Sequence, residues 1–191
     1  MRTKDEAKRR AIIEAAIEEV VAGGLAGASI ASIAKRAGVS QGTIYLYHVD
    51  KAALLRATFL EAKRAIHRAL MEAASDHAAT IDVIRAQWFA LHRFVERDPG
   101  TFLFAEQAMG AGLVGEDERA ELARMAAEML DPIERGLADG TLRSAPPAAI
   151  ASVLTAPAVQ LARRRVAEHG ACDDALLEAT FDLAWRGVAA D

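Results

Sequence analysis

The stretch SIASIAKRAGVSQGTIYLYHVDKAALL, residues 29–55, carries the signals of two short helices joined by a tight turn. Ser29 is a residue type that caps helix N-termini, and apolar residues follow it at helical spacing. Gly38 suits the left-handed residue that ends a helix, and Ser40 can cap the next one. A helix, a glycine turn and a second helix within about twenty residues form the helix-turn-helix pattern.

The rest of the 191-residue chain is also expected to be helical. Its Gly and Pro residues are confined to short breaks, and between the breaks apolar residues recur at helical rather than strand spacing. These patterns predict an all-α fold of about nine helices, with a three-helix head and a helical-bundle body. Besides the two short helices, we expect helices over residues 5–22, 51–75, 79–97, 102–109, 116–138, 146–168 and 173–188.

Charge is distributed unevenly along the chain, whose net charge is −4. Residues 1–51 hold eight Lys and Arg against six Asp and Glu, whereas residues 52–191 hold fifteen against twenty-one. A basic head on an acidic body can still bind DNA, because only the face near the phosphates has to be basic. Basic residues at the start of the first helix oppose its dipole, so they indicate either a nearby phosphate backbone or a solvated surface: Arg2, Lys4, Lys8, Arg9 and Arg10.

Several other classes of protein are disfavoured. The single cysteine, Cys172, cannot form an internal disulfide, so a reducing cytoplasm is expected. The charged N-terminus is not a signal peptide, and no segment is apolar enough to span a membrane. An all-α enzyme is the alternative class, but no nucleophile motif or phosphate loop supports it, and His67, His77 and His92 lack metal-ligand spacing. We therefore expect no catalytic residue, metal or cofactor.

The motif resembles the tetracycline-repressor (TetR) family of bacterial regulators. The matching features are Ser29, Ile33-Ala34, Ala37-Gly38-Val39-Ser40, Gly42-Thr43-Ile44-Tyr45, Tyr47, and Lys51 followed by Leu54-Leu55. Beyond residues 29–55, the chain matches the family only in the number, length and order of its helices. The resemblance implies a DNA-binding domain over residues 1–50 and an effector-binding and dimerisation domain over residues 51–191.

The candidate DNA-binding residues each have a physical reason. Gln41 can pair bidentately with adenine, and Thr43 can offer its methyl group to thymine or its hydroxyl to phosphate. Gly42 allows close approach of the backbone to the groove. The resemblance implies that Tyr45 and Tyr47 contact the DNA backbone or bases and that Lys51 binds a phosphate. The complete candidate set is Ser29, Ser40, Gln41, Gly42, Thr43, Tyr45, Tyr47 and Lys51.

Alternatives remain for this region. Ile33, Ala34, Val39 and Ile44 are expected in the core. Tyr45 could also serve only in packing, Ser29 and Ser40 could act only as caps, and Lys35 and Arg36 could be solvated charges.

Two positions depart from the family pattern. His48 stands where the family usually has phenylalanine, and we expect it to be a half-buried packing residue with a possible pH sensitivity. Ala31 stands where a basic or polar residue is frequent, which puts one DNA contact in doubt.

The resemblance further implies a ligand-responsive regulator, most often a repressor. Such a protein binds a palindromic operator as a homodimer through its last two helices, and a largely apolar small-molecule effector releases it. The alternative is a TetR-like ligand sensor or adaptor without specific DNA binding. Large apolar residues and one glutamine are candidates for the effector site, although aromatics and methionines at helical spacing are more often plain core: Trp88, Phe89, His92, Phe104, Gln107, Met125 and Met129.

Overall fold

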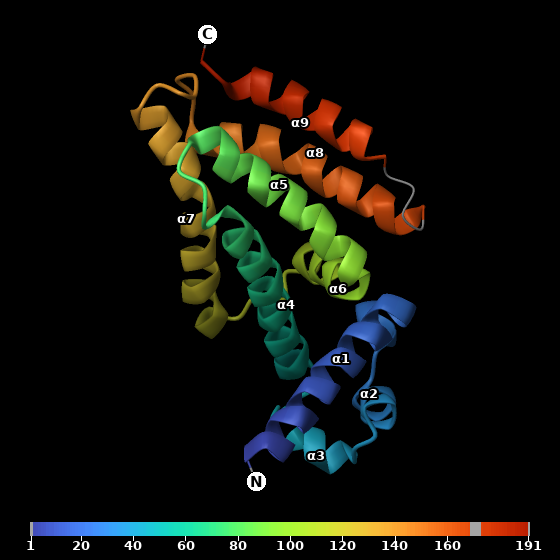
Figure 1. The fold of residues 1–191 in the computed structure, drawn as a ribbon. Coiled ribbons are helices and arrows are strands. Elements are labelled where there is room, and N and C mark those ends of the chain that lie inside the picture. Colours follow the sequence, from blue (N-terminus) through green and yellow to red (C-terminus); the bar gives the residue numbers. More distant parts are fainter. Residues whose placement is uncertain (1, 169–172, 191) are drawn as a thin grey trace. The chain divides into compact units, whose positions relative to one another are not determined.

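The computed structural model describes residues 2–168 and 173–190, and the predicted all-α fold is confirmed over these ranges (Figure 1). Cys172 lies outside the described residues. The only extended pairing that the described ranges contain is an isolated bridge between Leu142 and Ala189. The helices are α1 (Arg2–Gly27), α2 (Ile30–Ala37), α3 (Gln41–Tyr45), α4 (Lys51–Ala74), α5 (Thr80–Arg97), α6 (Pro99–Gly110), α7 (Glu116–Ala138), α8 (Pro147–Ala167) and α9 (Asp174–Val188).

The helices belong to two compact units. The first contains Met1–Arg64 and Gly100–Ala120, and the second contains Ala65–Pro99 and Glu121–Asp191. Helix α4 supplies its residues 51–64 to the first unit and its residues 65–74 to the second. One unbroken helix is therefore part of both units.

The core of the first unit joins the first four helices. Residues of α1, α2 and α3 and the first turn of α4 form one buried cluster, against which Val39 and Tyr47 are packed. The core positions expected for Ile33, Ala34 and Ile44 are confirmed, whereas Val39 is only half-buried. The buried members of this cluster, which we call the head core, are Ile12, Ala15, Ala16, Ile30, Ile33, Ala34, Ile44 and Leu54.

Helices α1 and α6 differ most from their expected ranges. The sequence predicts that the first helix ends at residue 22, but α1 continues to Gly27 with one non-helical residue, Gly24, inside it. With φ 73° and ψ 168°, Gly24 interrupts the helix at the glycine pair where the break was predicted. Helix α6 begins at Pro99, three residues before the expected start, because proline fits the first turn of a helix.

The core of the second unit is built from α5, α8 and α9, which pack against one another (Figure 1). The indole of Trp88 on α5 meets the ring of Phe181 on α9 edge to face, with 5.5 Å between ring centroids. Arg85 lies over the rings of Phe89 and Phe181 and pairs with Glu178 at the edge of this aromatic group. The contact of α5 with α9 is therefore apolar inside and ionic at its margin.

Candidate nucleic-acid interface

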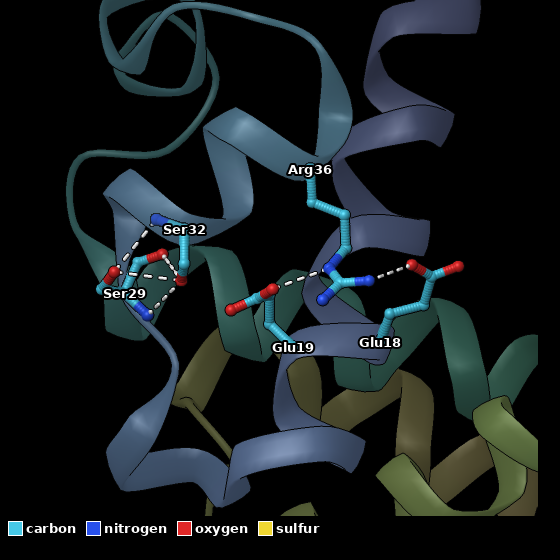
Figure 2. Close-up of polar contacts among 5 residues, drawn as sticks. All are labelled: Glu18, Glu19, Ser29, Ser32 and Arg36. Carbon is cyan, nitrogen blue, oxygen red and sulfur yellow. Dashed lines mark hydrogen bonds and ion pairs between the residues drawn. The ribbon is translucent and has the colours of Figure 1, made fainter.

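The N-terminus of α2 is closed by a reciprocal pair of serines (Figure 2). The Ser32 backbone N–H donates to Ser29 Oγ at 3.0 Å, and the Ser29 N–H donates to Ser32 Oγ at 3.1 Å. This is a capping box in which serine replaces the usual Glu or Gln. The predicted cap at Ser29 is confirmed, and the exposed Ser29 lies with the half-buried Ser32 at the positive end of the helix dipole.

The turn between α2 and α3 depends on Gly38. Its φ of 66° and ψ of 31° are left-handed, a conformation that costs other residues about 1 kcal/mol. The N–H groups of Gly38 and Val39 donate to the carbonyls of Lys35 and Ala34, at 3.3 and 3.0 Å. The last carbonyls of α2 are thereby satisfied, and the chain reverses within two residues to reach Ser40.

Helix α3 is anchored on one side and exposed on the other. Ser40 Oγ accepts from the Thr43 N–H at 3.1 Å and lies 2.9 Å from Thr43 Oγ1, so the predicted cap is confirmed. Ile44 is fully buried in the head core, whereas Gln41 and Gly42 are exposed and Tyr45 is 53% exposed. A short helix held by one isoleucine thus presents its first turn to solvent.

Gly42 is not required by the fold. A Cβ added there would have one atom within 4 Å, Ser40 Oγ at 3.7 Å, which is ordinary contact. Glycine within a helix nevertheless costs about 0.5–1 kcal/mol relative to alanine. The packing of the protein therefore does not explain the glycine at position 42. Close approach of the α3 backbone to a binding partner would explain it.

Two exposed apolar residues were missed by the sequence analysis. Leu46 is 81% exposed and Val49 is 82% exposed, both between α3 and α4. Leu46 follows the buried Ile44 by two residues, which on a helix turns its side chain about 200° away from the core. The two-residue spacing from Ile44, which was expected in the core, could have predicted that Leu46 is exposed.

Tyr47 is already engaged within the protein. Its ring packs on the head core, its hydroxyl donates to the Asp5 carboxylate, and the Arg9 guanidinium lies 5.7 Å from the ring centroid. The hydrogen bond to Asp5 is the main reason that the pKa of Tyr47 is raised, and burial adds to it. The Tyr47 side chain therefore connects the segment after α3 to the first turn of α1.

Lys51 begins α4 beside the chain that leads into α2. Its Nζ donates to the Ala26 carbonyl at 3.5 Å, a long hydrogen bond. The Asp50 carboxylate accepts from the Ala53 N–H at 2.7 Å and so caps α4. All eight candidate DNA-binding residues thus lie in the first unit, at the N-terminus of α2, on or beside α3, or at the start of α4.

Arg36 is not a free surface charge. Its Nε lies 2.6 Å from Glu19 Oε1 and its guanidinium is 3.0 Å from Glu18, so it connects α2 to α1 (Figure 2). A hydrogen bond from Ser32 and the bond from Arg36 lower the pKa of Glu19. Arg36 therefore holds α2 against α1. The neighbouring Lys35 is exposed.

The two departures from the family pattern have different structural settings. Ala31 is exposed in the first turn of α2, where it offers no polar group to a ligand. His48 is half-buried, as predicted, and burial followed by the nearby Arg9 lowers its pKa. A lowered pKa keeps His48 neutral at physiological pH, as a packing residue requires.

The candidate effector residues are divided between the two units. In the first unit, Phe104 is fully buried and Gln107 is exposed. The other five are in the second unit: Trp88, His92 and Met125 are buried, and Phe89 and Met129 are half-buried.

Trp88 and His92 form a distinctive buried pair on α5, with 6.4 Å between their ring centroids. Among the described residues, Trp88 Nε1 and both ring nitrogens of His92 have no hydrogen-bond partner. Burial, with a smaller contribution from Arg165, lowers the pKa of His92 to about 4. Neutral His92 supplies one donor and one acceptor, and Trp88 supplies a second donor.

The described ranges contain neither a candidate metal site nor a candidate membrane-spanning helix. Residues 2–168 and 173–190 contain no group of three or more His, Cys, Asp or Glu side chains that could hold a metal ion. Within the same ranges, no helix has the length and apolar character needed to cross a bilayer.

The head matches a known family of DNA-binding proteins. Residues 12–58 fit the family model of bacterial regulatory proteins of the tetR family. Over 76 residues, the chain is 46% identical to the HTH-type transcriptional regulator BetI of Yersinia pestis (strain Pestoides F). A TetR family transcription regulator from Marinobacter aquaeolei VT8 has a TM-score of 0.91 and 29% identity, with 100% of both chains covered. Over residues 12–58 the chain therefore matches the tetR family, and over its whole length its fold is similar to that of a TetR family transcription regulator.

The similarity of this chain to these proteins is strongest in the head. The match to BetI covers 40% of this chain and 36% of BetI, so it spans about a third of that relative. A putative tetR family regulator from Shewanella sp. PV-4, 24% identical with a TM-score of 0.84, covers 96% of this chain and 99% of its own, and shows the shared fold. The family therefore accounts for the helix-turn-helix, while the chemistry of the second unit has to be inferred from its own residues.

Proposed function

We propose that this chain is a TetR-family regulator that binds a palindromic operator as a homodimer, represses transcription when bound, and is released by a small-molecule effector. The observation that carries the proposal is the arrangement of α3, in which Ile44 is buried while Gln41, Gly42 and Tyr45 are exposed. In helix-turn-helix proteins the first turn of the second helix reads base edges in the major groove. Residues 1–50 would bind DNA, and residues 51–191 would bind the effector and form the dimer.

The exposed residues of α3 suit direct readout of bases. Gln41 would pair with a purine, most favourably adenine. Thr43 holds its hydroxyl against Ser40 Oγ, which leaves its methyl group for thymine. Gly42 would let the backbone approach between them, and the exposed Tyr45 and Leu46 would extend the apolar contact.

Phosphate contacts would come from the elements that flank α3. The capped N-terminus of α2 at Ser29 is the positive end of a helix dipole and favours an anion. The Lys51 ammonium has three donors, of which one makes the long bond to Ala26, so it can bind a phosphate as well. These contacts position the head without specifying sequence.

The last two helices are proposed as the dimer interface. They expose the apolar side chains Val153, Leu176 and Leu183, the last with 71% of its surface accessible. Two such helices and their symmetry mates can form a four-helix interface that buries these side chains. Arg165 of α8 pairs with Glu96 of α5 in its own chain.

The effector site is proposed around the buried pair Trp88 and His92. Polar groups without partners are costly inside a protein, and a ligand that supplies an acceptor for Trp88 and a complementary group for His92 would recover that cost. The aromatic and methionine side chains of the same unit suit the apolar remainder of such a ligand.

We infer that an effector bound at this pair would act on the head through α4. Gln87, next to Trp88, donates from Nε2 to the Met71 sulfur at 3.8 Å. Met71 lies near the end of α4, the helix that begins with Lys51. An effector would shift the equilibrium only if it bound the released state more tightly than the DNA-bound state.

DNA binding can be tested by fluorescence anisotropy on palindromic duplexes selected from a random library with the full chain. We expect salt-sensitive binding that Lys51→Ala weakens about tenfold, whereas Lys35→Ala, which removes the same charge from α2, has a smaller effect. Binding that does not respond to salt, or equal losses in the two variants, would contradict the proposal.

A further inference from the structure

Tyr47 and Asp5 join two parts of the head that are 42 residues apart in sequence. Tyr47 follows the recognition helix α3, and its ring is held in place by the head core. Asp5 is the acidic residue in the first turn of α1 and is exposed. The Tyr47 hydroxyl donates to the Asp5 carboxylate, and Arg9, one turn further along α1, lies over the ring.

This contact uses the only proton that the Tyr47 hydroxyl can donate. Carboxylate and phosphate oxygens are both pure acceptors, so one phenol O–H serves one of them at a time. A hydrogen bond to an ionised acceptor is among the stronger ones in a protein. In the free protein, therefore, Tyr47 is not available as a donor to the DNA backbone.

We propose that Asp5 is an internal competitor for the Tyr47 hydroxyl and that an operator phosphate displaces it when the head binds DNA. The inference rests on the proposed DNA-binding function and assigns Asp5 a part in it that the helix-turn-helix motif does not contain. The carboxylate holds the phenol in its oriented, packed position and lowers the affinity for DNA, because its hydrogen bond must be exchanged for the one to phosphate.

Arg9 makes the exchange feasible. Its guanidinium lies 5.7 Å from the Tyr47 ring centroid, so a phosphate that approaches the hydroxyl also approaches a cation. The displaced Asp5 carboxylate lies one turn of helix before this cation and is exposed to solvent. Phosphate and carboxylate thus compete for the Tyr47 hydroxyl, and the Arg9 guanidinium favours an anion beside it.

The test compares Asp5→Asn with Glu6→Gln in the full chain. Both variants remove one negative charge from an exposed position in the first two turns of α1, but only Asp5 bonds to Tyr47. With a duplex selected by the wild-type chain, we expect Asp5→Asn to bind about fivefold more tightly than Glu6→Gln. In a Tyr47→Phe background, which keeps the ring and removes the hydroxyl, this difference between the two variants should disappear.

A second measurement reports on the contact without DNA. The chain has two tyrosines, so Tyr45→Phe leaves Tyr47 as the only phenol for an ultraviolet pH titration. Adding Asp5→Asn to this variant should lower the pKa of Tyr47, whereas adding Glu6→Gln should leave it nearly unchanged. An unchanged pKa in the Asp5→Asn protein would overturn the contact on which the inference depends.

The outcomes separate this inference from the proposed function. A wild-type chain that shows no salt-sensitive binding to any duplex contradicts the proposed function and, with it, this inference. A wild-type chain that binds, with Asp5→Asn equal to or weaker than Glu6→Gln, leaves the proposed function intact and overturns the role of Asp5 as a competitor.

Discussion

Arg36 of α2 binds Glu19 of α1 with 2.6 Å between Nε and Oε1, and the same guanidinium lies 3.0 Å from Glu18. A hydrogen bond with Ser32 and the bond from Arg36 both lower the pKa of Glu19. A carboxyl group with a lowered pKa stabilises the folded state above its unfolded pKa, and this stabilisation is lost as the pH falls through the folded value.

The pH dependence of head stability follows from this contact. At neutral pH, Glu19→Gln should lower the melting temperature slightly, because exposed ion pairs contribute little. As the pH falls below the ordinary carboxyl pKa of 4.5, the wild-type chain and the variant should converge. Thermal unfolding followed by circular dichroism at pH 7 and pH 3 measures this, and a difference that grows on acidification would contradict it.

Ile44 and Leu46 should give opposite phenotypes although they are two residues apart. Ile44→Ala removes a fully buried side chain from the head core and should cost about 2–5 kcal/mol of unfolding free energy. Leu46→Ala changes an exposed side chain, so stability should remain within about 0.5 kcal/mol while DNA affinity falls. Urea unfolding and anisotropy on the same samples test both; a loss of stability in Leu46→Ala would show that Leu46 is part of the core.

The two glycines of the helix-turn-helix should also differ. Gly42→Ala should keep or raise stability, by up to about 1 kcal/mol, because the site accepts a Cβ, and it should weaken DNA binding. Gly38→Ala should cost about 1–2 kcal/mol because φ is 66°. Full DNA affinity in the Gly42→Ala protein would argue against close approach of the α3 backbone to the groove.

His92 predicts a second pH effect, in the second unit. Its pKa is lowered to about 4, so the neutral form is favoured in the folded state. Stability should be complete above about pH 6.5, the usual histidine value, and should fall by up to about 3 kcal/mol as the pH approaches 4. Urea unfolding of His92→Gln should show a weaker pH dependence over this window, whereas His77→Gln, at an exposed position, should behave like the wild-type chain.

Local chemistry explains what could be predicted from the sequence. The caps at Ser29, Ser40 and Asp50 were predictable because each side chain bonds to a backbone N–H three residues ahead. The turn at Gly38 was predictable because few other residues tolerate its conformation. Helix existence and order followed from apolar spacing for the same local reason.

Contacts between distant residues could not be predicted in the same way. The bond of Tyr47 to Asp5 and that of Arg36 to Glu19 depend on how α1 packs against α2 and α3, which apolar spacing does not specify. The candidate effector residues show the same limit. Phe104 is fully buried and Gln107 is exposed, although they are three residues apart on α6. The packing of a helix against its neighbours decides which of its side chains are buried.

Recognition of bases by the first turn of α3 can be measured through Gln41. The quantity is the ratio of affinities for a selected palindromic duplex and an unrelated duplex, determined by anisotropy at one salt concentration for the wild-type chain and for Gln41→Ala. We predict that Gln41→Ala reduces affinity for the selected duplex about tenfold and leaves affinity for the unrelated duplex nearly unchanged. An unchanged ratio, with both affinities retained or both reduced equally, would contradict base recognition by this helix.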